Sequence, residues 1–434
     1  MSVNNKDKDK ITLSGAIAMG TGVMIGAGIF TLTGEIANYA GPYFIIAFTL
    51  AGCVSALTSY TYVKMSNSYP SSGGVAKILT KVYGNSSIAA WGALLMLFSM
   101  IINQSLVART FANYLSRSSF LTISSSSIPY VATALVIFSF FINILSNQAI
   151  QKFQFIGAFF KAIGLFLLAI GGLAASGVDI NAIIPQSEVD NVSILNILGS
   201  IAVGVLAFKG FTTITNSGGE ITDPKKNIGK AIKYTIIICI SVYLLVTFAV
   251  SNSLSINEII SAKNYTLAEA ARPTYGEFGV NITIFVALIS TFTGIVASMF
   301  AVSRMLTMLT KMDLVPHKHF GLPGNIQKHL LVYITVITAL LTLVFNVSRI
   351  AAMGAFFYLV MDILIHYGVF KYANRKEVHF NSLLLIFSIV IDVIIFLGLF
   401  WIKIEEDPWL IIYSIAGMSL IYFIERFYLK KVNI

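Results

Sequence analysis

Long apolar runs, separated by short polar stretches, repeat along the whole chain. A run of about 20 apolar residues is long enough to cross the roughly 30 Å hydrocarbon core of a bilayer as an α-helix. Such a helix satisfies its own backbone hydrogen bonds, as lipid requires. The pattern therefore predicts an all-α polytopic membrane protein with about 12 transmembrane helices. The expected spans are 12–37, 42–65, 88–115, 128–147, 152–175, 194–221, 230–252, 278–303, 329–347, 350–371, 381–402 and 408–428.

Composition agrees with this class. Of the 434 residues, 56% are hydrophobic and 11% are charged, whereas soluble proteins carry about 25% charged residues. The polar start runs into the first span without a signal-peptide cleavage site, so we expect no cleaved leader. The two cysteines lie in apolar spans and the five histidines form no ligand cluster, so we expect no metal and no cofactor.

Basic residues predict the orientation. With the N-terminus placed inside, 21 of the 29 Lys and Arg residues fall on cytoplasmic segments, as the positive-inside rule requires. The net charge of +10 is then explained by topology, and no nucleic-acid partner is needed. We expect a multi-pass protein of the cell membrane, in contact with the lipid bilayer, with cytoplasmic tails at 1–11 and 429–434.

Two spans contain glycines and polar residues where an uninterrupted helix would be expected. The first contains "GVMIGAGIF" (22–30), and the sixth contains "SIAVGVLAFKGFTTITNSGGE" (200–220). Interrupted spans at corresponding places in two repeats indicate a transport site near the middle of the membrane. The chain then divides into a first inverted repeat at 12–175, a second at 194–371, and two further helices at 381–428.

A broken helix supplies the chemistry for an amino acid. The N-terminus of one half offers free N–H groups to a carboxylate, and the C-terminus of the other offers carbonyls to an ammonium group. Glycine lets a ligand approach the backbone closely. The alternative is that these glycines only allow close packing of helices.

Four stretches resemble the amino acid–polyamine–organocation (APC) transporter superfamily. "GVMIGAGIF" is similar to its first-helix motif, and "FKGFTTITNSGGEITDPKKNIGKAI" (208–232) is similar to its sixth-helix exit and following loop. "SRMLTMLTKMDLVP" (303–316) resembles the end of its eighth helix, and "FQFIGAFFKAIGLFLLAIGG" (153–172) a fifth helix with a mid-membrane lysine. The likeness covers nearly the whole chain and is nearest to prokaryotic, sodium-independent, proton-coupled amino acid transporters.

The resemblance implies where the substrate binds. Its carboxylate would bind N–H groups of the first break, at Gly26, Ala27 and Gly28. Its amine would bind carbonyls of both breaks, at Met24, Leu206, Ala207 and Lys209. Leu206 and Phe208 stand where the family places gating or side-chain-pocket residues. Ala27 replaces a common serine, Lys209 replaces an apolar residue, and an acidic pair is reduced to Glu220.

Lys161 lies near the middle of the fifth span, about 13 Å from its start. An ionisable residue at this depth is costly and indicates function. The resemblance implies that its ammonium group takes the place of a sodium ion between the first and eighth helices. It would bridge carbonyls near Gly20 and Val23 to hydroxyls of Ser290 or Thr293, and would carry the coupled proton. The alternative is a permanently charged structural pin.

Four other polar residues lie in the spans, and one of them, Lys209, leaves alternatives open. The Lys209 side chain either faces an acidic substrate or turns toward the cytoplasm and holds Glu220 or a carbonyl. Asp362 and His366, four residues apart, are expected to pair on one helix face. Asp392 lies in the eleventh span.

The sequence therefore predicts a secondary transporter that moves amino acids by alternating access with protons. An amino acid or polyamine exchanger of the same fold is the first alternative, and a non-transporting amino acid sensor is the second. The sequence has no clustered Ser/His, paired-Asp or metal constellation that would indicate an enzyme. It also has no continuous polar stripe that would indicate a channel.

Overall fold

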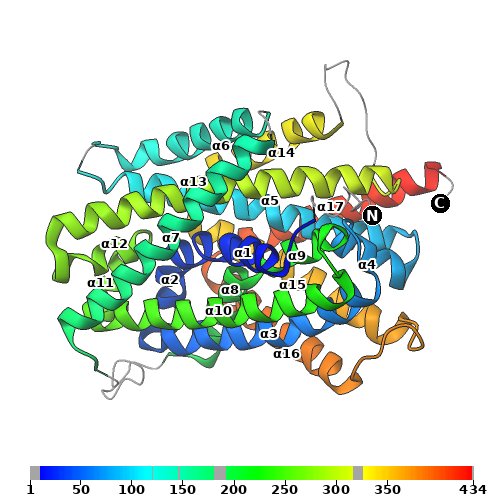
Figure 1. Cartoon of the computed structure of the whole chain (residues 1–434), viewed down its shortest axis with the longest axis horizontal. Coiled ribbons are helices and arrows are strands. Elements are labelled where there is room, and N and C mark those ends of the chain that lie inside the picture. The colour runs from blue at the N-terminus through cyan, green and yellow to red at the C-terminus, as the bar shows by residue number, and fades with distance from the viewer. Residues whose placement is uncertain (1–9, 120, 145–146, 180–191, 316–325, 433–434) are drawn as a thin grey trace, which may run out of the picture.

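The structure is a computed structural model that describes residues 10–119, 121–144, 147–179, 192–315 and 326–432. Figure 1 shows a bundle in which most helices run roughly along the long axis. In the described part, the only β-type pairing is an isolated bridge between Ile11 and Ile221. Most of the expected N-terminal tail lies outside these residues, as do the last two residues of the C-terminal tail.

The helices of the first half begin with two short ones in place of one continuous first span. They are α1 (Leu13–Met24), α2 (Ala27–Ala40), α3 (Phe44–Ser68), α4 (Gly74–Tyr83), α5 (Ser87–Leu115), α6 (Ile128–Ile144) and α7 (Asn147–Ser176), with the short 3-10 helices η2 (Gly41–Tyr43) and η3 (Ser125–Ser127).

The second half likewise begins with a divided span. Its helices are α8 (Ile194–Phe208), α9 (Phe211–Asn216), α10 (Pro224–Ser253), α11 (Ile256–Ser261), α12 (Thr266–Ala270), α13 (Arg272–Lys311), α14 (Ile326–Val344), α15 (Val347–Tyr372), α16 (Ser382–Glu406) and α17 (Pro408–Val432), with the 3-10 helix η5 (Gly218–Glu220).

The polytopic all-α prediction is confirmed. Ten described segments are long and apolar enough to cross a membrane, with Gly28–Ser68 counted as one, and Leu13–Met24 and Ile163–Ala174 are shorter apolar helices. When α1 and α2 form the first span and α7 the fifth, these segments correspond to the expected spans. The short helix α4, which packs on α5 and α15, was not predicted.

The two divided spans lie inside the bundle. The last ten residues of α8, Gly199–Phe208, are all buried, and α8 packs against α2, α3 and α16. Helix α1 packs against α9 and α10. Small residues permit these contacts, because a Cβ on Gly204 of α8 would lie 2.8 Å from the Cβ of Ala51 on α3.

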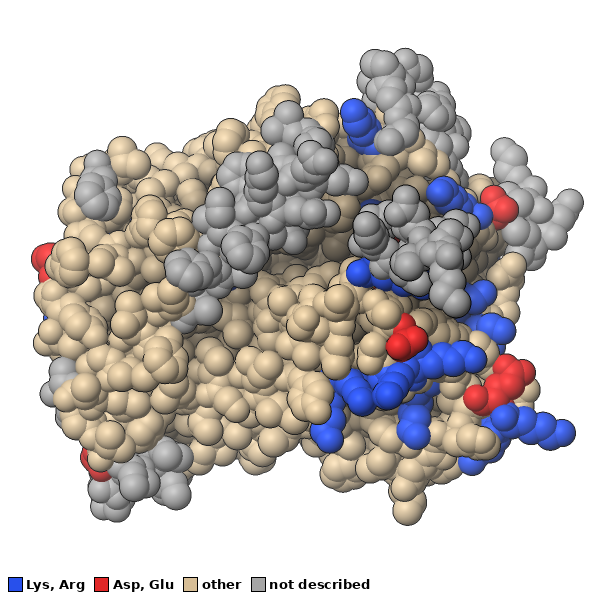
Figure 2. All heavy atoms as spheres, viewed as in Figure 1, with Lys and Arg blue, Asp and Glu red and all other residues tan. Residues whose placement is uncertain are grey.

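Charged side chains are distributed unevenly over the surface. On the face shown in Figure 2, Lys and Arg gather toward one end of the molecule, and the other end is largely uncharged. The basic end is the end at which α17 finishes (Figure 1).

Candidate functional site

The first break separates α1 from α2 at Ile25 and Gly26. Gly26 has φ 132° and ψ −83°, a conformation that glycine adopts readily and residues with a Cβ do not. A Cβ at this position would also lie 3.3 Å from Lys161 Nζ and 3.4 Å from Ser290 Cβ. Gly26 is therefore needed both for the turn and for the close approach of Lys161.

The second break separates α8 from α9 at Lys209 and Gly210, and it touches the first. A Cβ on Gly210 would lie 2.7 Å from Met24 Cγ and 3.1 Å from Met24 N. A Cβ on Gly28 would lie 2.9 Å from Ala207 Cα. The close-packing alternative thus accounts for Gly28 and Gly210, whereas it does not account for the positive φ of Gly26.

Tyr243 on α10 joins the two breaks. Its hydroxyl oxygen lies 2.5 Å from Met24 O and 3.2 Å from Ala207 O, and the side chain is buried. These are two of the carbonyls that the resemblance assigns to the substrate amine. Each carbonyl oxygen has two lone pairs, so Tyr243 leaves one acceptor position on each and fixes their directions.

A small cavity of about 40 Å³ lies between the breaks. Five of the predicted binding residues line it: Met24, Gly28, Leu206, Ala207 and Lys209. The rest of the lining is Val23, Met100, Asn103, Gly210, Thr212, Thr213 and Ser298. Two other predicted binding residues, Gly26 and Phe208, are not in this lining. The Phe208 ring packs against Phe48 and Tyr243 at centroid distances of 6.1 Å and 5.0 Å.

A larger cavity of about 780 Å³ adjoins the small one, and the two share Val23 and Thr213. Lys161, Gly22 and Thr293 line this cavity, as do Glu220, Arg304 and Lys311. The predicted substrate residues that line the small cavity therefore lie beside the cavity that contains Lys161 and the charged residues Glu220, Arg304 and Lys311.

Lys161 on α7 is 5% exposed and its Nζ donates to Gly22 O at 3.2 Å. The sequence predicts acceptors among the carbonyls near Gly20 and Val23, and Gly22 lies between these two residues. Gly20 itself packs against α9 and α10, where a Cβ would lie 2.7 Å from Ile214 Cδ1 and 2.9 Å from Thr235 Cγ2.

The two hydroxyls expected near Lys161 lie on α13. Thr293 lines the same cavity as Lys161, and its hydroxyl lies 2.7 Å from Ile289 O on its own helix. Ser290 is fully buried, and its Oγ has no hydrogen-bond partner among the described residues. Ser290 is therefore the hydroxyl that is still free to accept from an ammonium group.

Lys209 turns its ammonium group toward α5. Its Nζ lies 3.0 Å from Ser99 O and 3.1 Å from Ser99 Oγ. The sequence left open whether the Lys209 side chain faces the substrate or holds Glu220 or a carbonyl. In the structure its ammonium group holds the carbonyl of Ser99. Glu220 pairs instead with Arg304 on α13, at the mouth of the larger cavity.

Asp362 and His366 pair on α15 as expected, with His366 Nε2 3.5 Å from Asp362 Oδ1. Asp392 on α16 joins them, with its Oδ2 3.4 Å from the same nitrogen. The contact of Asp392 with this pair was not predicted, because it depends on how α15 and α16 pack. His317 and His319 lie outside the described residues.

The site also contains residues that the sequence did not indicate. Tyr243 lies in an apolar span, and Asn103 and Ser298 are single polar residues on α5 and α13. A lone polar residue in a span is a weak signal, because many such side chains bond only to their own helix.

Comparison with known proteins identifies the family. The amino acid permease family model matches residues 11–421. An uncharacterized protein of Methanocaldococcus jannaschii is 29% identical over 92% of this chain and 90% of its own length. The inner membrane transport protein YbaT of Escherichia coli is 25% identical over 96% of this chain and 95% of its own length. The serine/threonine exchanger SteT of Bacillus subtilis is 22% identical over 86% of this chain and 85% of its own length. The chain belongs to the amino acid permease family, within the APC superfamily, and is a membrane transporter rather than an enzyme.

Proposed function

We propose that the protein takes up amino acids by alternating access, driven by protons and independent of sodium. The substrate carboxylate binds the N–H groups of Gly26, Ala27 and Gly28 at the start of α2. The substrate amine binds carbonyls of the two breaks, at Met24, Leu206, Ala207 and Lys209. The repeats at 12–175 and 194–371 provide the two halves that move relative to each other.

The position of Lys161 carries the proton part of the proposal. Its ammonium group lies against Gly22 and Gly26 of the first break and faces a cavity that water can fill. No carboxylate forms an ion pair with it in the described part of the chain. In the proposal this ammonium group carries the coupled proton and takes the place of a sodium ion.

The orientation follows from charge. Cytoplasmic surfaces of membrane proteins are rich in Lys and Arg, and these residues gather at one end in Figure 2. We place that end, with both termini, in the cytoplasm of a cell. The larger cavity then opens inward through Glu220, Arg304 and Lys311, and the conformation is inward-facing.

The small cavity favours small neutral amino acids. Its lining combines apolar side chains with Asn103, Thr212, Thr213 and Ser298, and it contains no carboxylate. The Lys209 ammonium group is already held by Ser99, which reduces its attraction for an acidic substrate. A relative that is named a serine/threonine exchanger agrees with this class and makes exchange of such amino acids the second candidate.

Uptake into proteoliposomes tests the proposal. Radiolabelled serine, threonine or alanine should accumulate when the outside is acidic, equally well in sodium and in choline buffer. Excess unlabelled small neutral amino acids should compete, whereas glutamate and lysine should not. A strict sodium requirement would contradict the ion assignment. Flux that requires internal amino acid and ignores the pH gradient would establish exchange, and binding without any flux would establish a sensor.

A further inference from the structure

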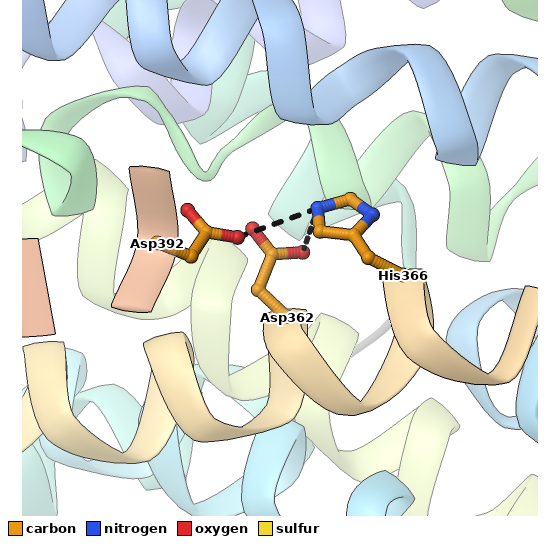
Figure 3. Close-up of side chains that lie close together, drawn as sticks. All are labelled: Asp362, His366 and Asp392. Atoms are coloured by element: carbon orange, nitrogen blue, oxygen red, sulfur yellow. Dashed lines mark ion pairs between the residues drawn. The ribbon is translucent and has the colours of Figure 1, made fainter. Parts of the chain in front are cut away.

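Three ionisable side chains meet in the interior of the bundle, away from both cavities. Asp362 and His366 lie on successive turns of α15, and Asp392 reaches them from α16 (Figure 3). All three are fully buried. One ligand atom from each lies within 4.8 Å of the others, and none of the three lines either cavity.

The cluster needs two positive charges. A neutral imidazole and two carboxylates together carry a charge of −2, and burying even one unpaired charge in a membrane protein is costly. Asp362 Oδ2, both carboxylate oxygens of Asp392 and His366 Nε2 have no hydrogen-bond partner among the described residues. Buried polar atoms are normally satisfied, so these unsatisfied atoms indicate a missing ligand.

The surroundings orient the ligand atoms. His366 Nδ1 lies 2.7 Å from Thr61 Oγ1, a contact that fits an Nδ1–H donating to the hydroxyl and leaves the Nε2 lone pair facing the carboxylates. The Tyr62 hydroxyl donates to Asp362 Oδ1 at 2.6 Å. Metal-binding histidines and carboxylates are typically held by such outer hydrogen bonds.

The distances favour a shared ion over direct hydrogen bonds. His366 Nε2 is 3.5 Å from Asp362 Oδ1 and 3.4 Å from Asp392 Oδ2. An N–H···O hydrogen bond measures about 2.7–3.2 Å, so both distances are too long. Two ligands at about 2.1 Å from a tetrahedral Zn²⁺ lie about 3.4 Å apart.

We propose that Asp362, His366 and Asp392 bind a divalent transition-metal ion of the zinc class. One imidazole nitrogen with carboxylate oxygens suits Zn²⁺, whereas Mg²⁺ and Ca²⁺ prefer oxygen ligands alone. The ion neutralises the cluster and joins α15 to α16. Because the site lies outside both cavities, the metal has a structural role and is not transported.

Metal content tests the proposal. The whole protein is expressed in zinc-supplemented medium, washed with EDTA in detergent and measured by mass spectrometry for metals. The wild type should retain about one zinc per chain, and Asp392→Asn and His366→Gln should retain almost none. His379→Gln is the control, because His379 is an exposed histidine between α15 and α16 and its loss should leave the zinc in place.

Two further measurements cover variants that fold poorly. Thr61→Val keeps all three ligands and should lower zinc affinity by about 10-fold or more through loss of the imidazole contact. Protein grown with Co²⁺ should show the intense visible bands of a tetrahedral site. A wild type that retains no more zinc than Asp392→Asn, and has no cobalt bands, would overturn the proposal; two protons would then neutralise the cluster.

Discussion

The ammonium group of Lys161 lies 3.2 Å from the carbonyl oxygen of Gly22, in the last turn of α1 before the break. This contact links α7 to the part of the first span that must move if access alternates. Under the proposed proton coupling, a proton on Lys161 would strengthen this link and its loss would release it, so the two protonation states would favour two conformations.

Lys161→Ala should abolish accumulation driven by a pH gradient. Substrate binding and exchange should persist, because the proposed substrate contacts come from the backbone. Lys161→Arg should also fail to accumulate substrate, since arginine keeps its charge at any working pH. Proteoliposome uptake with and without an imposed pH gradient measures both effects.

Lys311→Ala is the matched control for this experiment, because Lys311 lines the same cavity but is exposed. It should keep the response to pH. Full proton-driven accumulation by Lys161→Ala would mean that another group carries the proton.

The breaks could be predicted from sequence because their signal is local. Glycines and polar residues stand where apolar helix formers belong, and "GVMIGAGIF" and residues 200–220 contain that signal without reference to the rest of the chain. The same holds for the span positions, which depend on the length and hydropathy of each segment.

Partners across helices could not be predicted, because they depend on how each helix is rotated. The sequence placed the Lys161 acceptor among the carbonyls near Gly20 and Val23, and only the packing of α7 against α1 selects Gly22. Phe208 is likewise turned from the cavity toward Phe48 and Tyr243. The Asp392 contact depends on the register between α15 and α16, which no pattern within either helix encodes.

Tyr243→Phe should weaken substrate binding and lower stability. The change leaves Met24 O and Ala207 O without their shared donor, and loss of a buried hydrogen bond costs about 1–3 kcal/mol. Binding affinity and the thermal unfolding midpoint should both fall. Tyr234→Phe removes the same hydroxyl from an exposed position on α10 and should change neither. Unchanged affinity in Tyr243→Phe would show that the two carbonyls need no fixed direction.

The ion pair between Glu220 and Arg304 should affect transport more than stability. Their side chains are 34% and 43% exposed, and exposed pairs contribute about 0–1 kcal/mol. The pair joins η5, which follows α9, to helix α13, and both residues line the larger cavity. Glu220→Arg or Arg304→Glu alone should therefore slow uptake through like-charge repulsion. The double charge swap should restore much of the rate. If the swap is as slow as the single changes, one of the two residues acts separately from the pair.

Gly26→Ala and Gly22→Ala form a matched pair within one motif. A non-glycine residue held at φ 132° is strained by about 1–3 kcal/mol, and the added methyl would also press on Lys161 and Ser290. We expect Gly26→Ala to reduce uptake by on the order of tenfold or more, since each 1.4 kcal/mol corresponds to a factor of ten. A Cβ on Gly22 would meet nothing within 4 Å, so Gly22→Ala should transport as the wild type does.

Initial uptake rates, normalised to the amount of folded protein in the liposomes, measure both variants. Equal rates for the two variants would show that the break does not depend on the conformation of Gly26. That result would contradict the proposal that the substrate carboxylate binds the backbone N–H groups at this break.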